Sequence, residues 1–153
     1  MEKLWKYKVC RMTYIQVACA IIEDDGKILA TQRSESMSLP LKWEFPGGKI
    51  HTGERPDECL RRELMEELGI EVIVGRPLPL TTHEYPTFTV TLHPFICAIA
   101  EGEITLNEHA ACCWLRPEQL SCLDWAEADL PLLENCRIHT QRRGAPESPV
   151  PIQ

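Results

Sequence analysis

The sequence predicts an α/β fold in which a mixed β-sheet packs between helices. β-prone, largely apolar segments lie on both sides of one stretch with strong helical periodicity, at residues 54–68. Two further helical segments are expected near the C-terminus, one beginning near Pro117 and one spanning about residues 126–136. Because strands that precede and follow a central helix bury their apolar faces under helices, these elements indicate a sheet covered on both sides.

The expected strands are apolar runs separated by turn residues. Residues 13–22 and 28–31 form a hairpin signal, because Asp24-Asp25-Gly26 lies between them. Residues 33–48 contain serines, prolines and paired glycines without a sustained period, which indicates a loop. Pro94 implies an edge position or a bulge in its strand, because proline cannot donate a ladder hydrogen bond. The later strands are expected at residues 70–74, 87–100 and 110–115.

The stretch at residues 56–68 carries the clearest helical pattern in the chain. Its leucines recur every four residues, proline suits the first turn of a helix, and Gly69 is placed to end it. Steps of about 100° per residue place three glutamates at about 240–340° when the leucines occupy about 0–80°. Glu63, Glu66 and Glu67 therefore border the apolar stripe and do not lie on the fully solvated side.

Three carboxylates on one helical face repel one another, by a few tenths of a kcal/mol per pair in water and by more beside apolar walls. A hard divalent cation compensates this repulsion, because magnesium and manganese bind carboxylate oxygens and bridge to phosphates. The alternative is a solvated acidic face in which Arg62 pairs with Glu66, four residues later. The helix alone favours that alternative.

Length and composition indicate one soluble domain. The chain has 153 residues, of which 44% are hydrophobic and 25% charged, as in an ordinary compact domain. We expect residues 1–140 to form it and residues 141–153, which contain three prolines, to be a disordered tail. No segment approaches the roughly 20 apolar residues of a membrane span, and the first residues lack the apolar stretch of a secretory signal.

Charge and cysteine usage narrow the partners and the compartment. The formal net charge is −7, which disfavours a stable complex with DNA or RNA and requires local cations for a small phosphorylated substrate. Eight cysteines lie mostly in apolar runs without a Cys-x-x-Cys pair, so we expect buried free thiols in a reducing cytosol. Five histidines lack ligand spacing, so zinc is not expected, and His109 is expected at the surface.

A pattern of fixed residues surrounds the acidic helix and decides between its two interpretations. The pattern occupies the 23 residues from Gly48 to Ile70. Its remaining fixed members, in order, are Glu54, Arg62-Glu63-Leu64, Glu66-Glu67 and Gly69. This spacing resembles the complete Nudix box, and the chain is identified as a member of the Nudix family.

The resemblance implies an α/β/α sandwich that hydrolyses a nucleoside diphosphate linked to another moiety. Members of the family hold Mg²⁺, or Mn²⁺, on the acidic helix and on the loop before it. The corresponding positions here are Glu63, Glu66, Glu67 and the main-chain carbonyl of Gly47. The family role of Glu54 and Arg62 is that of organisers, which hold the loop and orient the catalytic carboxylate.

Segments outside the box resemble the MutT-type nucleoside triphosphate pyrophosphohydrolases. Residues 43–49 match the segment before the box, with Phe45 as a substrate-binding position. Arg33 matches a phosphate-binding arginine, and its forked guanidinium suits phosphate oxygens; the alternative is an ordinary surface arginine. Glu108 matches an additional glutamate that binds metal or acts as a base; the alternative is a turn residue.

Residues 123–133 most nearly resemble the CTP pyrophosphohydrolase branch of this subgroup. The residue at the position of Asp129 contacts the nucleobase in such enzymes, and a carboxylate there can accept from an exocyclic amine. The alternative is that Asp129 stabilises the first turn of its helix through the macrodipole.

The expected reaction is Mg²⁺-dependent hydrolysis of a nucleoside triphosphate to a nucleoside monophosphate and pyrophosphate. Oxidised dGTP and CTP or dCTP are the alternatives for the substrate. Glu63 is the first choice for the general base and Glu108 the second. The rival functions are hydrolysis of a nucleotide sugar or a dinucleoside polyphosphate, and nucleotide sensing by a catalytically silent module. The sequence allows a monomer or a homodimer.

Overall fold

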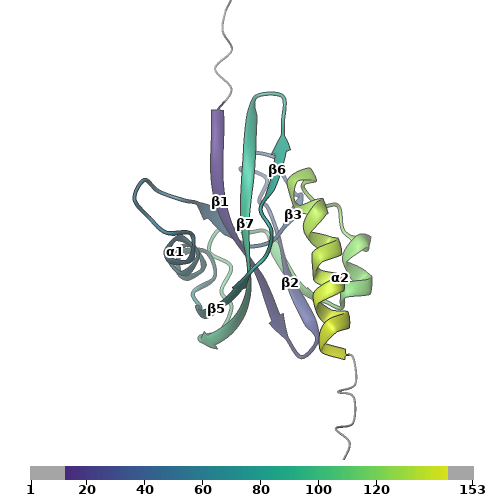
Figure 1. Ribbon diagram of the computed structural model, residues 1–153. Helices are drawn as coiled ribbons and strands as arrows, with labels where there is room; N and C mark the ends of the chain where they lie inside the picture. The colour runs from purple at the N-terminus through teal and green to yellow at the C-terminus, as the bar shows by residue number, and fades with distance from the viewer. Residues whose placement is uncertain (1–12, 145–153) are drawn as a thin grey trace, which may run out of the picture.

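The computed structural model describes residues 13–144, which form a twisted sheet with helices on both of its faces (Figure 1). Helix α1 (Pro56–Leu68) lies on one side of the sheet, and α2 (Leu130–Gly144) lies on the other, preceded by the 3-10 helices η1 (Pro117–Cys122) and η2 (Glu127–Asp129). The strands are β1 (Thr13–Asp24), β2 (Lys27–Gln32), β3 (Trp43–Glu44), β4 (Gly47–Lys49), β5 (Glu71–Pro77), β6 (Thr81–Glu84), β7 (Phe88–Glu101) and β8 (Ala111–Leu115).

The sheet is mixed, as the sequence predicts. Its main path runs in the order β3-β2-β1-β7-β5, while β4 pairs with β1, β6 with β7, and β8 with β2. The long central strands β1 and β7 are parallel, and the pairings of β1 with β2 and of β7 with β5 are antiparallel. A sheet covered by helices on both faces confirms the expected α/β architecture.

The predicted hairpin at the start of the domain is confirmed. β1 and β2 are antiparallel, with Asp24 opposite Lys27. The two residues of the turn, Asp25 and Gly26, have φ values of 48° and 72°. A two-residue hairpin turn of this kind needs positive φ at both positions, which aspartate tolerates and glycine adopts freely.

Three short strands were not expected from the sequence. The predicted loop at residues 33–48 contains β3 and the beginning of β4, so that prediction is wrong in part. Strand β6 reads Thr-Thr-His-Glu, which has no apolar alternation, and it forms only because β7 offers a partner from Thr89 to Leu92. Long-range pairing therefore overrides local preference in these segments.

Pro94 lies in an interior strand, so the edge alternative is wrong. β7 has β1 on one side over its whole first part, and on its other side it pairs first with β6 and then with β5. Pro94 lies where β7 changes from one of these partners to the other, next to a register irregularity between Val74 and Pro77. The irregularity agrees with the bulge alternative and accommodates a residue that donates no hydrogen bond.

Strand β1 divides the core into two halves because successive side chains point to opposite faces of a sheet. Ala18, Ala20 and Ile22 pack with the α1 leucines in one apolar cluster. Cys19 and Ile21 belong to the other cluster, which α2 covers with Leu132, Leu133 and Cys136. Strand β1 is thus buried on both faces and contributes side chains to the core on the α1 side and to the core on the α2 side.

The C-terminal helix is longer than expected. α2 extends to Gly144, whereas the sequence suggested an end near residue 136 and a tail from residue 141. Residues 1–12 and 145–153, including most of that expected tail, lie outside the described residues. Among residues 13–144, no helix is long and apolar enough to cross a membrane.

The seven cysteines in the described part of the chain are free thiols. Cys112 and Cys113 are half-buried, and Cys122 is exposed, so the prediction of burial is wrong for Cys122. Cys10 lies outside the described residues. The buried thiols are Cys19, Cys59, Cys97 and Cys136.

Replacement of Leu64 by alanine is expected to lower the free energy of unfolding by about 2–5 kcal/mol, because the side chain is fully buried between α1 and the sheet. Urea unfolding measures this change. The matched control is Met65→Ala on the neighbouring, 44% exposed position, where a change within about 0.5 kcal/mol is expected. Equal effects at the two positions would contradict the register assigned to α1.

Candidate active site

The glutamates of α1 differ in exposure as the helix turns. Glu67 is 6% exposed and faces the sheet, whereas the Glu66 side chain is 55% exposed and the Glu63 side chain 15%. The predicted position of these carboxylates beside the leucine stripe is therefore correct for Glu63 and Glu67. Glu66 points into solvent more than the steps of about 100° per residue predicted.

Glu67 is a buried acid in an acidic neighbourhood. Burial raises the pKa of its carboxyl to about 9. Three nearby carboxylates add to this rise: those of Glu44, Glu63 and Glu108. The Oε2 atom of Glu67 has no hydrogen-bond partner, which is rare for a buried polar atom and indicates a missing ligand. A divalent cation at this position would satisfy the oxygen and offset the repulsion.

The paired glycines of β4 allow the loop to pass between β1 and α1. A side chain at position 47 would overlap the Ala18 carbonyl, because β4 pairs directly with β1 there. A side chain at position 48 would overlap the carboxylate of Glu63. The backbone of Gly47 also hydrogen-bonds Glu67. Glycine at both positions thus brings main-chain atoms to the acidic face of α1.

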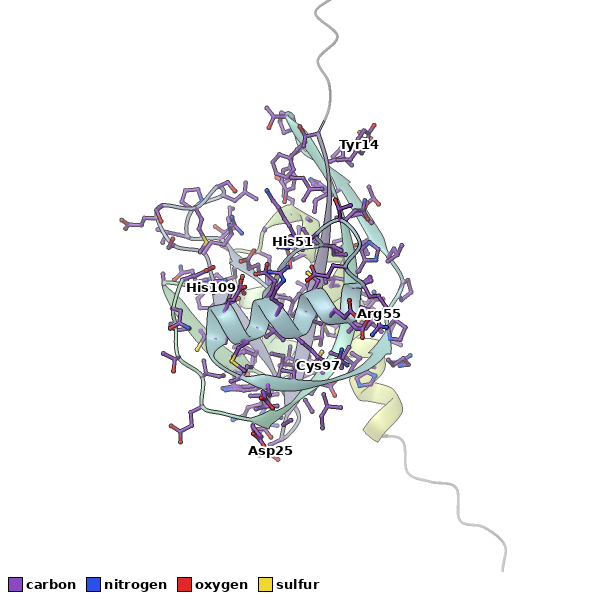
Figure 2. All side chains as sticks on the ribbon, turned by 90° about the vertical axis from the view of Figure 1, so that its left-hand side faces the viewer. Tyr14, Asp25, His51, Arg55, Cys97 and His109 are labelled. Atoms are coloured by element: carbon purple, nitrogen blue, oxygen red, sulfur yellow. The ribbon has the colours of Figure 1, made fainter. Side chains whose placement is uncertain are left out.

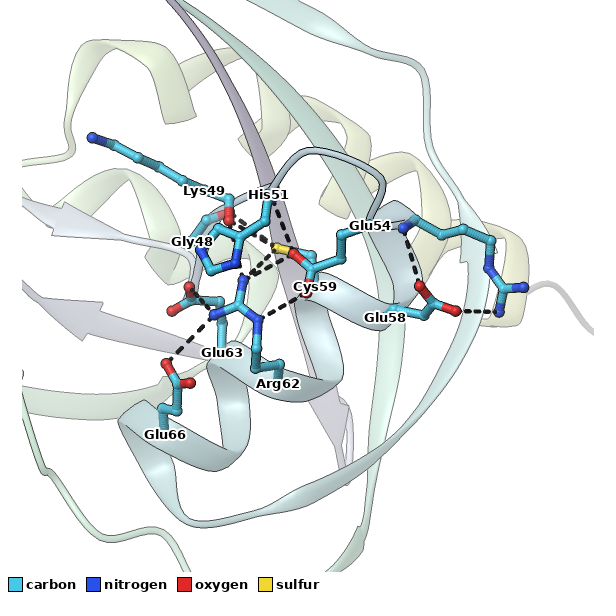
Figure 3. A network of polar contacts seen from close by, with 10 residues as sticks. Gly48, Lys49, His51, Glu54, Glu58, Cys59, Arg62, Glu63 and Glu66 are labelled. Atoms are coloured by element: carbon cyan, nitrogen blue, oxygen red, sulfur yellow. Dashed lines mark hydrogen bonds and ion pairs between the residues drawn. The ribbon is translucent and has the colours of Figure 1, made fainter.

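Arg62 holds the outer carboxylates of this site (Figure 3). Its Nε and Nη2 atoms donate to the two oxygens of Glu54 at 2.8 and 2.9 Å. Nη1 donates to Glu63 at 2.8 Å and lies 3.5 Å from Glu66. The hydrogen bonds from Arg62 lower the pKa of Glu54 to about 2, so that carboxylate stays ionised. Arg62 therefore links Glu54, on the loop before α1, to Glu63 on the helix.

The carboxylate oxygens near Glu67 are suitable ligands for a hard divalent cation, although the side chains do not point toward one common position. Among the described residues, no three acidic, histidine or cysteine side chains are grouped closely enough to hold a metal ion. The reason is visible in Figure 3, where Glu63 and Glu66 are turned toward Arg62. The fit rests on two observations. Glu67 has a buried oxygen without a hydrogen-bond partner, and the carboxylates near it offer oxygen ligands, which hard divalent cations prefer.

His109 is buried, so the expectation of a surface position is wrong. Its side chain is 1% exposed, and Figure 2 shows it beside one end of α1. Its Nε2 lies 3.0 Å from Oε1 of Glu44, whose other oxygen accepts a 2.8 Å hydrogen bond from Arg33. Arg33 also donates to the carbonyl and the hydroxyl of Ser38, at 2.6 and 3.0 Å. The guanidinium is thus fixed from two sides.

Glu44 and His109 were not among the expected site residues. The local signal for Glu44 was weak, because it lies in the unpredicted strand β3, where it is opposite Thr31. His109 follows Glu108 directly, and that adjacency was the one available signal for it.

A cavity of about 560 Å³ joins the acidic residues to an aromatic region. That volume is in the usual range for a small-molecule site. In the aromatic region, the ring of Phe45 packs against Trp125 at a centroid distance of 4.7 Å. The predicted site residues that line the cavity are Arg33, Phe45, Gly47, Glu67, Glu108 and Asp129. Those that do not line it are Glu54, Arg62, Glu63 and Glu66.

Asp129 is buried at the aromatic end of the cavity, with 6% of its surface exposed. Its Oδ1 accepts a 3.1 Å hydrogen bond from the main-chain N–H of Phe45, so the carboxyl is turned toward β3 and β4. Burial raises its pKa to about 8, and the charge of Glu44 adds to the rise. This geometry favours a role in the cavity over stabilisation of the first turn of α2.

The family description "NUDIX domain" matches residues 12–136 of the chain. The chain belongs to the Nudix family. Similar proteins include the CTP pyrophosphohydrolase of Escherichia coli (strain K12), 41% identical over 123 residues that cover 80% of this chain and 91% of the relative. The 8-oxo-dGTP diphosphatase of the same strain is 32% identical over 123 residues, with coverage of 80% and 95%.

Solved structures share the fold of this chain. The solution structure of the E. coli ORF135 protein matches with a TM-score of 0.72 and 37% identity, over 90% of this chain and 96% of that one. Family membership makes the acidic helix α1 the helix of a Nudix hydrolase.

Glu67→Gln is expected to stabilise the metal-free protein, on the order of 1–3 kcal/mol, because it removes a buried ionisable group from an acidic cluster. Chemical unfolding in EDTA measures this change. Added Mg²⁺ should stabilise the parent and not the variant. Glu66→Gln, on the exposed side of the helix, is the matched control and should change the metal-free stability by less than about 0.5 kcal/mol. A Glu67 variant less stable than the parent in EDTA would contradict this account.

Asp129→Asn is expected to change how stability depends on pH. The folded pKa of Asp129 is about 8 against an ordinary value of 3.8, so between these pH values the folded protein retains a proton that the unfolded chain releases. The contribution of Asp129 to stability is therefore full below about pH 4 and declines as pH rises to about 8. Urea unfolding of parent and variant over this range should show the parent losing stability relative to the variant. Parallel curves would rule out a raised pKa.

Proposed function

We propose that this Nudix protein hydrolyses a nucleoside triphosphate, of the oxidised dGTP or the CTP or dCTP type, to a nucleoside monophosphate and pyrophosphate. The observation that carries the proposal is a single cavity with two chemically different ends. One end holds Glu67, whose buried Oε2 has no hydrogen-bond partner and whose charged neighbours are carboxylates, and the other end is aromatic and contains Asp129. Phosphates bridged to a cation and a stacked base fit these ends. The names of the similar E. coli enzymes support the same substrate class.

The cofactor that we propose is Mg²⁺, with Mn²⁺ as a substitute. The residues that would hold it are Glu63, Glu66, Glu67, Glu108 and the Gly47 carbonyl. When bound, the cation lowers the pKa of an attacking water and neutralises charge that develops on the phosphates.

The chain itself supplies positioning around the phosphates. Within the described part of the chain, Arg33 has two N–H groups left after its contacts with Ser38 and Glu44, and these are available to phosphate oxygens. Arg62 fixes the Glu63 carboxylate, which is the first choice for the general base. Glu108 lines the cavity and is the second choice.

Two other functions remain as alternatives to be tested. A nucleotide sugar or a dinucleoside polyphosphate would place a different group in the aromatic end, and a substrate panel distinguishes these from triphosphates. A catalytically silent module would bind nucleotide and metal without turning over any member of the panel. We also propose a reducing, cytosolic location, in keeping with the free thiols of the described cysteines.

The double variant Glu66→Gln/Glu67→Gln tests the proposal directly. Removing two carboxylate charges from the cation site should lower triphosphate hydrolysis in Mg²⁺ by about 100-fold or more. Release of pyrophosphate measures the rate. The control is the double variant Glu103→Gln/Glu118→Gln, which makes the same chemical change at two exposed positions and should keep full activity. Activity of the site variant within a few-fold of the parent would refute the assignment.

A further inference from the structure

Tyr85 is a fixed aromatic residue at the end of the cavity where the base would bind. It follows β6, and its main-chain N–H donates to the Phe88 carbonyl at 2.7 Å across the turn into β7. Its ring stacks on Phe88 at a centroid distance of 4.7 Å and meets the edge of His83 at 4.5 Å. The side chain lines the cavity and is 8% exposed. Packing on two sides leaves the ring little freedom to change its direction.

The hydroxyl group of Tyr85 has a donor without a partner. The main-chain N–H of Ala128 donates to the hydroxyl oxygen at 3.0 Å. That contact uses a lone pair and leaves the hydroxyl proton to be directed elsewhere. The part of the chain that the structure describes gives this proton no acceptor. Burial raises the pKa of the phenol above its ordinary value, so the proton is retained at neutral pH.

A second polar group lies next to this hydroxyl. Asp129 directly follows Ala128, lines the same cavity and has one oxygen committed to the main-chain N–H of Phe45. Because the Tyr85 hydroxyl accepts from Ala128, the residue before Asp129, the two side chains lie at the same end of the cavity. The aromatic end of the cavity therefore presents two polar groups to a bound ligand: the Tyr85 hydroxyl and the Asp129 carboxyl.

An unpaired hydroxyl donor in such a place calls for an acceptor on the ligand. Guanine presents a carbonyl oxygen where adenine presents an amino group, and cytosine carries a carbonyl oxygen as well as its amino group. At the position where guanine has its carbonyl oxygen, the amino group of adenine cannot accept from the hydroxyl and leaves the buried donor unsatisfied. The ring nitrogen N7 also accepts, but adenine and guanine share it, so it does not distinguish them. A site that hydrogen-bonds one substrate group discriminates strongly against an analogue without it.

We propose that the Tyr85 hydroxyl is a specificity-determining donor that binds a carbonyl oxygen of the nucleobase and so favours guanine-type or cytosine-type nucleotides over adenine nucleotides. The inference rests on the proposed function, because it concerns the base of the same substrate. It assigns one element of base choice to a residue on the β6–β7 turn, separate from Asp129.

The competing role for the hydroxyl is structural. It could act only by holding the Ala128 N–H, and with it the position of Asp129. Loss of a structural contact would weaken every nucleotide in the panel by a similar factor. Loss of a direct contact to a carbonyl would weaken guanine-type or cytosine-type nucleotides alone. The ratio between substrates thus separates the two roles.

Tyr85→Phe tests the proposal because it removes a single oxygen and keeps the ring. Steady-state kinetics with dGTP, 8-oxo-dGTP, CTP and dATP give kcat and KM for parent and variant. The parent should prefer carbonyl-bearing substrates, and the variant should lose about tenfold in kcat/KM on the preferred one, the usual size for one hydrogen bond. The loss should appear mainly in KM, with dATP unchanged within about twofold. The preferred substrate tells guanine-type from cytosine-type recognition.

The matched control is Tyr14→Phe, which removes the same oxygen from a side chain that is 73% exposed and should leave all rates unchanged. An equal loss on all four nucleotides, no loss on any of them, or a parent without preference over dATP would overturn the proposal. If the parent hydrolyses no triphosphate, the proposed function fails instead. Calorimetric binding of GMP, CMP and AMP then tests this inference. Tyr85→Phe should weaken the binding of GMP or CMP relative to AMP, and an equal loss for all three would overturn it.

Discussion

Glu67 is a buried carboxylate whose charged neighbours are also carboxylates, and much of the site is arranged around it. The register of α1 turns this residue inward, because the leucines at every fourth position fix which face meets the sheet. The glycines of β4 then let the backbone approach the acidic face, where side chains would overlap Ala18 and Glu63. Packing that stabilises the fold therefore concentrates negative charge at one end of a cavity.

Two arginines form ion pairs with the carboxylates around Glu67 but not with Glu67 itself. Arg62 is occupied with Glu54, Glu63 and Glu66, and Arg33 is occupied with Glu44. Within residues 13–144, no basic side chain forms an ion pair with Glu67. Without a basic partner the Glu67 carboxyl keeps its proton at neutral pH, with a pKa of about 9. A divalent cation would take the place of that proton and keep positions open for phosphate oxygens. The two arginine clamps thus define where a cation is needed.

The parts of this site that follow from local sequence were predicted well. Helix α1 matches its predicted bounds because leucine spacing, proline and glycine all point to the same answer. The turn at Asp25 and Gly26 was equally clear, since only a few residue types adopt positive φ. Helical spacing also separated the inward Glu67 from the purely solvated side of the helix.

The parts that depend on distant pairing were not predictable in the same way. Glu44 meets His109 across 65 positions of sequence, and Phe45 meets Asp129 across 84. Both contacts exist because β3, a strand of two residues, is held by its pairing with β2, and so short a segment has no periodicity to detect. A buried histidine next to Glu108 therefore looked like a surface residue until its partner was in place.

Strands β1 to β4 connect the two ends of the cavity mechanically. Cys19 of β1 lines the cavity, while Ala18 and Ala20 of the same strand support α1 from behind. The segment from Glu44 to Gly47 passes from the Arg33 and His109 contacts, through the N–H that Asp129 accepts, to the glycine beside Glu67. A base bound against Asp129 and a phosphate bound near Glu67 would therefore lie against the two ends of one segment of four consecutive residues. Because these residues are fixed by strand pairing on one side and by buried hydrogen bonds on the other, the distance between the base end and the cation end is set by the fold and not by a mobile loop.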